Sequence, residues 1–183
     1  YAYIVMALNE CTIIVNVYTA RFVQNAFGIL TDLVDHVDHT TNCGGHFPHP
    51  DMMIQLSLTN MQRFAIYPSV YGSICSFLVT LFDEANDKED VGDWIGVMLQ
   101  ADAIPIVLDA MKRGKRSAEM QWHGSLLLLH LLQGNRGQQQ QLCHAIQSSK
   151  GLSILACAVE NFPDNPHVQH FETQCIEAFV VPF

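Results

Sequence analysis

The sequence predicts an all-α chain built from consecutive three-helix units, the arrangement known as an α-solenoid. Apolar residues recur at intervals of three and four along most of the chain, as they do on one face of a helix. In addition, four apolar anchors open matching helical patterns at a nearly constant spacing, and three of the four are followed by Gln. The anchors are Val23, Val70, Met120 and Val168. The alternative is a compact helical bundle without repeats.

The first unit is expected over about residues 1–38, where Phe27, Leu30 and Val34 follow the first anchor on one helical face. The second unit is expected over 51–83. Its second helix covers Met53 to Phe64, and its third begins at Pro68, because proline is favoured at the first helical position. The segments 39–50 and 84–90 are expected to be loops, and the second of these is an exposed acidic cluster.

The third unit is expected over 91–134, with a first helix from Val91 to Ala101. Ile104-Pro105 opens its second helix, and Ser117 is the expected N-cap of its third, because a serine hydroxyl can accept a bond from a free amide of the first turn. The apolar residues expected inside are Val107, Leu108, Met111, Met120, Leu127, Leu128 and Leu131.

The fourth unit is expected over 137–181. Its first two helices cover Gln138 to Ser148 and Gly151 to Phe162. The third begins at Asn165-Pro166, with Asn as the N-cap and Pro at the first helical position. The apolar face of this third helix carries Val168, Cys175, Ile176 and Phe179.

Composition narrows the class of protein. Charged residues make up only 15% of the 183 residues, below the roughly 25% of an average soluble chain, which excludes a charged, disordered segment. The formal net charge of −9 argues against direct nucleic-acid binding. The six cysteines contain no CxxC pair and match no disulfide framework, so a reducing, cytoplasmic environment is expected. Because the chain begins at Tyr1 and ends within an apolar run, we expect it to be part of a longer protein.

One stretch is long enough to suggest a membrane span. Residues 64–82 carry no charge, close to the roughly 20 apolar residues that cross a bilayer. Pro68 interrupts the stretch, and several serine, threonine and glycine residues dilute it. Buried helices are therefore expected here, and no transmembrane segment.

The segments 103–107 and 120–128 resemble the second and third helices of armadillo repeats, with Ile-Pro at the start of the second helix. Val168-Gln169 through Phe179 matches the same third helix. The resemblance is good over 91–181 and weak over 1–90; HEAT repeats are the nearest rival. It implies a right-handed superhelix whose third helices line a concave groove that binds a peptide or helix of a partner protein.

The resemblance also implies which positions face that groove. In the nuclear-import adaptors of this family each third helix presents a Trp and, four residues later, an Asn. The matching positions here carry neither residue type, so a ladder for basic peptides is not predicted. These positions are Ile29, Ser76, Leu126 and Gln174 for Trp, and Leu33, Thr80, His130 and Ala178 for Asn. We take Ser76, Thr80, Leu126, His130, Gln174 and Ala178 as the groove-facing candidates.

Two further clusters are candidate sites. The segment 36–49 is rich in zinc-type ligands, yet its spacing matches no known finger, and a solvated loop is the alternative. Its ligand candidates are His36, His39, Cys43, His46 and His49. The basic cluster of Lys112, Arg113, Lys115 and Arg116 could dock an acidic tail or a phosphate, although cations also suit the C-terminus of a helix, which is the interpretation we favour.

No nucleophile elbow and no Gly-rich phosphate cradle is recognisable, so the sequence predicts neither an enzyme nor a cofactor. The predicted function is a protein–protein interaction scaffold within a larger, multi-subunit assembly. The alternatives are a structural subunit buried in a large complex and a metal-binding module built on 36–49.

Overall fold

The computed structural model describes residues 2–10, 17–35, 50–87 and 91–180. Every regular element within these ranges is an α-helix, which confirms the predicted all-α class. The helices are α1 (Ala2–Glu10), α2 (Val17–Asp35), α3 (Pro50–Arg63), α4 (Pro68–Asp87), α5 (Val91–Gln100), α6 (Ala103–Arg113), α7 (Ala118–Leu131), α8 (Arg136–Ser148), α9 (Gly151–Asn161) and α10 (Pro166–Val180).

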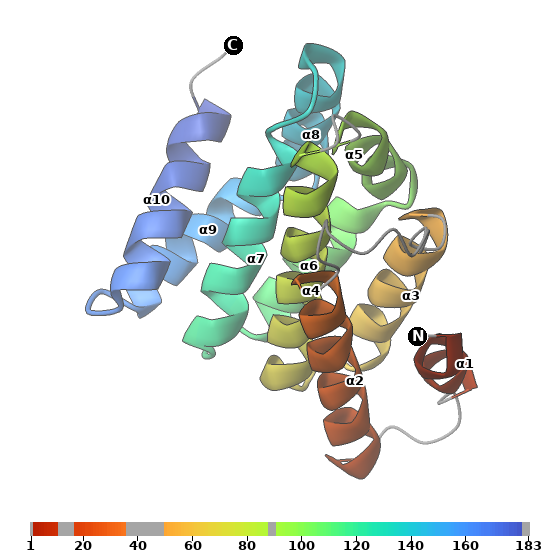
Figure 1. The fold of residues 1–183 in the computed structure, drawn as a ribbon. Coiled ribbons are helices and arrows are strands. Elements are labelled where there is room, and N and C mark those ends of the chain that lie inside the picture. Colours follow the sequence, from red (N-terminus) through yellow and green to blue (C-terminus); the bar gives the residue numbers. More distant parts are fainter. Residues whose placement is uncertain (1, 11–16, 36–49, 88–90, 181–183) are drawn as a thin grey trace.

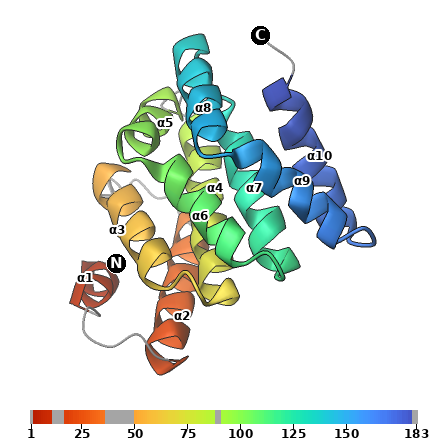
Figure 2. The same ribbon diagram turned by 180° about the vertical axis from the view of Figure 1, so that it is seen from behind.

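The helices stack in layers. Four of them, α2, α4, α7 and α10, lie side by side (Figure 1), and each packs against the next. We call these four helices the third-helix layer. On the other side of the molecule α3, α6 and α9 form a second row (Figure 2), with α3 packed on α6 and α6 on α9, and α5 packs on α8. The apolar core therefore lies between two rows of helices.

The four anchor residues hold the same place in this arrangement. Val23, Val70, Met120 and Val168 each lie in a different helix of the third-helix layer, and each side chain is at most 1% exposed. The sequence interval between successive anchors, which we call one repeat, therefore marks equivalent buried positions on four neighbouring helices.

The turn that leads into a helix of the third-helix layer occurs three times with the same backbone hydrogen bonds. In each copy the amide of one residue donates to the carbonyl four residues earlier. The carbonyl of that same residue accepts a bond from the amide three residues later. The donor–acceptor pairs are Phe64–Asn60 and Tyr67–Phe64, then Gly114–Ala110 and Ser117–Gly114, then Phe162–Ala158 and Asn165–Phe162. Successive copies lie one repeat apart, with the same spacings as the last three anchors.

A second recurring feature is the sharp bend before α6 and before α9. Asp102 and Lys150, which lie one repeat apart, are the two described non-glycine residues with positive φ, at 52° and 56°. One left-handed residue ends one helix and lets the next start in a new direction. Both α5 with α6 and α8 with α9 meet at 70°.

The boundaries differ from the predicted ones at two places. α4 continues through 84–87, into the segment expected as a loop, because Glu84 and Ala85 are good helix formers. α3 begins at Pro50, inside the expected 39–50 loop, since the missing amide hydrogen of proline costs nothing at the first helical position.

No single helix in the described ranges is long and apolar enough to cross a bilayer. In the uncharged stretch 64–82 the apolar side chains of α4 pack inside the protein, as predicted. Those with at most 1% exposure are Val70, Tyr71, Ile74, Cys75, Phe77, Leu78, Leu81 and Phe82.

The predicted N-caps of α7 and α10 are both formed. The Ser117 hydroxyl accepts a bond from the Met120 amide at 3.3 Å, and the Asn165 side chain accepts one from the Val168 amide at 3.1 Å.

Ser117→Ala and Asn165→Ala should each lower the free energy of unfolding by about 1 kcal/mol, because each leaves a first-turn amide without its acceptor. Urea denaturation measures this. Gln140→Ala, at an exposed site on α8, is the control, and an equal loss there would contradict the capping role.

Candidate functional site

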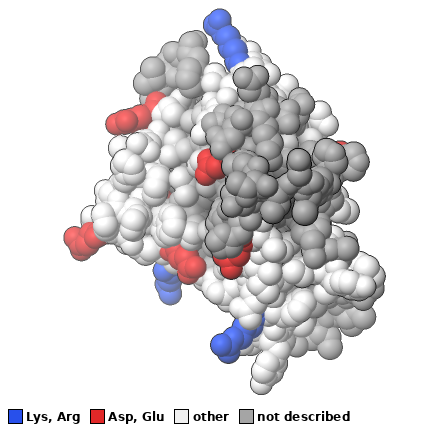
Figure 3. Space-filling view, viewed as in Figure 1, with Lys and Arg blue, Asp and Glu red and all other residues white. Residues whose placement is uncertain are grey.

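The six groove-facing candidates all lie in the third-helix layer, outside the apolar core. Ser76 and Thr80 are on α4, Leu126 and His130 on α7, and Gln174 and Ala178 on α10. Gln174 is exposed and the other five are half-buried. In the view of Figure 3, which faces this layer, charged side chains are sparse over the described atoms of α7 and α10. The candidates on α7 and α10 therefore sit on a surface of low charge.

Two histidines of α7 contact residues of α4 on this surface. The Nδ1 atom of His123 lies 3.5 Å from the Ser76 hydroxyl, and burial lowers the pKa of His123 to about 4. The Nδ1 atom of His130 lies 3.5 Å from a carboxylate oxygen of Asp83. Burial lowers the pKa of His130, while the charge of Asp83 raises it. His123 is therefore uncharged at neutral pH and acts as a polar, aromatic surface.

An aromatic cluster joins α7 to α10 beside these residues. The Trp122 ring stacks on the ring of His123 with centroids 3.5 Å apart and faces Phe171 at 6.2 Å. The ring of His167 lies 5.5 Å from Trp122. Trp122 is half-buried, so part of this indole is accessible. Such half-exposed aromatic rings commonly anchor protein partners.

A buried polar cluster lies beneath the surface where α4, α7 and α10 meet. Glu172 of α10 is 0% exposed, and neither of its carboxyl oxygens has a hydrogen-bond partner. Burial raises its pKa to about 8; the nearby Ser125 hydroxyl offsets this in part, although no bond of ordinary geometry joins the two groups. Glu172 is therefore mostly protonated at neutral pH.

The other titratable groups of this buried polar cluster are also neutral at this pH. Burial raises the pKa of Cys75 to about 12, and burial, together with Glu172, raises that of Cys175. Burial also raises the pKa of Tyr71, whose hydroxyl has no hydrogen-bond partner. The Cys175 thiol donates to the Ser125 carbonyl at 3.3 Å. Thiols held protonated in this way are poor nucleophiles, so the cluster lacks the activated group that thiol catalysis needs.

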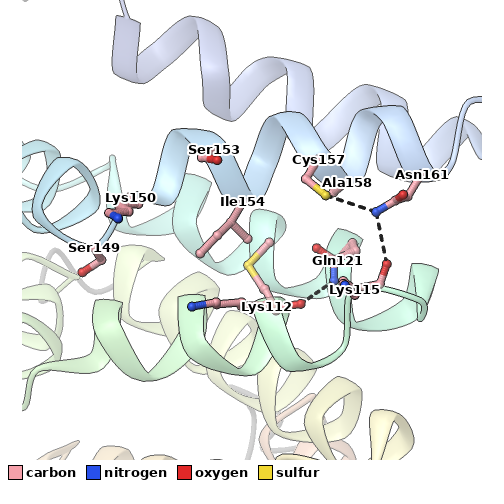
Figure 4. Close-up of a pocket in the computed structure, with 11 residues that line it drawn as sticks. Lys112, Lys115, Gln121, Ser149, Lys150, Ser153, Ile154, Cys157, Ala158 and Asn161 are labelled. Atoms are coloured by element: carbon pink, nitrogen blue, oxygen red, sulfur yellow. Dashed lines mark hydrogen bonds between the residues drawn. The ribbon is translucent and has the colours of Figure 1, made fainter.

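The predicted basic cluster divides between two environments. Arg113 forms an ion pair with Asp109 at 2.6 Å on the exposed side of α6, and Arg116 is exposed. Lys112 and Lys115 instead line a pocket of about 290 Å³ between α6 and α9, shown in Figure 4. Two of the four cations therefore lie at this pocket and two lie outside it.

The candidate metal ligands His36, His39, Cys43, His46 and His49 lie outside the described residues, so the metal hypothesis stays a prediction. Within the part of the chain that the structure describes, no group of three or more His, Cys, Asp or Glu side chains could hold a metal ion.

Sequence reasoning missed Glu172 and Lys150, although a signal existed for both. Glu172 lies four residues after Val168 and three before Cys175, so the helical period places it on the buried face. Lys150 falls one repeat after Asp102, so the spacing of the anchors already relates the two positions. The role of Lys150 depends on a pocket between helices, and no single-helix pattern reveals that.

No protein-family model, no curated protein and no solved structure matches this chain. What the chain does must therefore be inferred from its described side chains and their geometry.

Proposed function

We propose that this chain is a non-enzymatic scaffold, a right-handed armadillo-like α-solenoid whose third helices bind an extended or helical segment of a partner protein. The observation that carries the proposal is the third-helix layer. Its successive helices present Ser76, Leu126 and Gln174 at equivalent positions outside the core, and charged side chains are sparse over the described atoms of α7 and α10 (Figure 3).

The recurring geometry supports a solenoid over a bundle without repeats. The same turn occurs three times and the same left-handed bend twice, with successive copies one repeat apart. In a solenoid each unit packs mainly on its neighbours, so one local geometry can serve repeatedly. A compact bundle has no reason to repeat its hydrogen bonds at a fixed interval.

The chemistry of the surface indicates which partner would bind. His123 is uncharged at neutral pH, and Trp122 and Phe171 offer aromatic faces. Binding would therefore depend on apolar side chains of the partner and on hydrogen bonds to hydroxyl and amide groups such as those of Ser76 and Gln174. We expect a partner segment with aromatic or aliphatic side chains, in contrast to the basic peptides bound by import adaptors.

A peptide selection tests this proposal. We expect peptides selected from a random display library on the purified chain to be rich in aromatic and aliphatic residues. Leu126→Arg and Gln174→Arg should each weaken the binding of such a synthetic peptide by about tenfold or more, because each places a charge where the apolar side chains of the peptide bind. Fluorescence anisotropy measures the affinity.

The control is Gln147→Arg, which adds the same charge at an exposed site on α8. This variant should keep the affinity of the original protein. Because Gln174 is exposed, Gln174→Arg should also keep the melting temperature, which separates lost binding from lost folding. Peptides that are insensitive to both surface variants, or a selection that enriches none, would contradict the proposal.

A further inference from the structure

The row formed by α3, α6 and α9 contains two pockets at equivalent places. One, the α3–α6 pocket, has a volume of about 330 Å³; the other, the α6–α9 pocket, has about 290 Å³. Five residues of α6 line the first, and their counterparts one repeat later on α9 line the second. The α6 set is Pro105, Ile106, Asp109, Ala110 and Arg113, and the α9 set is Ser153, Ile154, Cys157, Ala158 and Asn161.

The opposite walls correspond as well, again with one repeat between them. Met61, Gln62 and Ala65 line the α3–α6 pocket, and Met111, Lys112 and Lys115 line the α6–α9 pocket. Gln62 and Ala65 of the first pocket correspond to Lys112 and Lys115 of the second. A neutral amide and a methyl group are thus replaced by two ammonium groups. The repeat supplies its own comparison, because the backbone framework is shared and the charges are not.

The acidic residue of the first pocket is also lost in the second. Asp109 pairs with Arg113 at the α3–α6 pocket, so the lining there has no net charge. At the matching places the α6–α9 pocket has Cys157 and Asn161, and no carboxylate is among its lining residues. Lys150 adds a third cation, so the lining carries three positive charges in a chain whose net charge is −9.

The third cation lies at one end of the pocket. In Figure 4 the Lys112 side chain points toward the end where Ser149 and Lys150 lie, and Lys115 lies at the other end, near Asn161. Lys150 directly precedes α9, and no side chain caps that helix. The positive end of the α9 dipole therefore adds to the field of the two ammonium groups.

We propose that the α6–α9 pocket binds a phosphomonoester dianion, the group carried by a phosphorylated serine or threonine of a partner segment, between Lys112, Lys150 and the Ser149 hydroxyl. Ammonium and hydroxyl donors at the start of a helix can bond to three oxygens of a tetrahedral dianion. At about 290 Å³ the pocket lies just below the roughly 300–1,000 Å³ of most small-molecule sites, which favours a compact group such as a single phosphorylated side chain. This site lies in the row of α3, α6 and α9, so it does not depend on binding at the third-helix layer.

Titration of the isotope-labelled chain tests the inference. The probes are a blocked Gly-phosphoserine-Gly peptide, its unphosphorylated twin and inorganic phosphate, and the readout is the amide resonances of Gly151 and Ser153. We expect the phosphopeptide to shift both resonances saturably and the twin to leave them unchanged. Inorganic phosphate binding as tightly as the phosphopeptide would support the same chemistry with the free anion as its source.

Matched double variants separate a site from general charge attraction. Lys112→Gln with Lys150→Gln should weaken the phosphopeptide by about tenfold or more, since two charge-assisted bonds are lost. Arg113→Gln with Arg116→Gln removes the same charge from residues outside this pocket, and its affinity should stay within about threefold. Equal losses in the two double variants, or no saturable shift with either phosphate probe, would overturn the proposal.

Discussion

The protein is expected to lose stability as the pH rises from 6.5 to 8, and replacing Glu172 with Gln is expected to remove most of that loss. Burial raises the pKa of this carboxyl group from 4.5 to about 8. Between these values the native state keeps a proton that the unfolded state releases, so stability falls as the pH rises. The stability linked to the proton on Glu172 is fully present below pH 4.5 and is lost above pH 8. At about 1.4 kcal/mol per pKa unit, the cost by pH 7 is on the order of 3 kcal/mol.

The window above pH 6.5 isolates this carboxyl group from His123. Burial lowers the pKa of His123 to about 4, so the unfolded state binds a proton first as the pH falls. The stability that neutral His123 contributes is present above pH 6.5 and lost between pH 6.5 and 4. Its effect opposes that of Glu172 only in the lower range. The other titratable groups of the buried polar cluster, namely Tyr71, Cys75 and Cys175, stay protonated up to pH 8, because their pKa values are raised as well.

Urea denaturation at several pH values between 6.5 and 8 measures the effect. The free energy of unfolding of the unchanged protein should fall across this range, and that of Glu172→Gln should fall much less. Glu160→Gln, at an exposed site on α9, is the control and should keep the original slope. Glu172→Met should be more stable than Glu172→Gln, because it also removes the unpaired polar atoms from the core. Parallel profiles for the original protein and Glu172→Gln would show that Glu172 is not a buried, protonated group.

Much of the fold could be predicted because the repeated signals are local. Ser117 and Asn165 are polar caps directly before apolar helical patterns, and the structure places both at the start of helices. The anchors are apolar at positions set by the helical period, and all four are buried. The missed boundary at 84–87 has a local cause too, because an acidic run can be a helix as readily as a loop when its residues have high helix propensity.

The sites could be predicted less well because they depend on contacts between helices. The buried polar cluster joins Tyr71, Ser125 and Glu172, which lie in three successive units, on α4, α7 and α10. The helical period shows that Glu172 points inward, but not which helix it meets. The α6–α9 pocket likewise joins Lys112 to Lys150 across two units. Only the pairing of neighbouring units brings such residues together.

Gln121→Ala is expected to destabilise the protein by about 3 kcal/mol. The Gln121 amide donates to the carbonyl oxygen of Met111 at 2.8 Å (Figure 4) and to that of Gly114 at 3.0 Å, and its side chain is 1% exposed. The Met111 carbonyl lies in the last turn of α6, which has no helical donors of its own, and the Gly114 carbonyl directly follows that helix. Alanine removes both bonds. It leaves the Met111 carbonyl without a partner in a buried site, at about 1–3 kcal/mol for an unsatisfied group, while the half-buried Gly114 carbonyl loses one bond and keeps the one from the Ser117 amide.

The next unit contains the same pair of bonds, so it makes the prediction sharper. The Gln169 amide donates to Val159 at 2.9 Å and to Phe162 at 3.1 Å, again ten and seven residues earlier. Gln169 is half-buried, so water can replace part of the loss, and Gln169→Ala should cost about 1–2 kcal/mol. The two bond pairs share no partner, so the double variant should lose about the sum of the single losses.

Chemical denaturation of the two single variants, the double variant and the control Gln140→Ala measures these values. The control removes an exposed amide of α8 and should change stability by less than about 0.5 kcal/mol. A larger loss of stability in Gln121→Ala than in Gln169→Ala, with nearly additive values, would indicate that both amides have the same structural role at sites that are buried to different degrees. Losses no larger than that of the control would mean that these amides do not hold the second and third helices of a unit together.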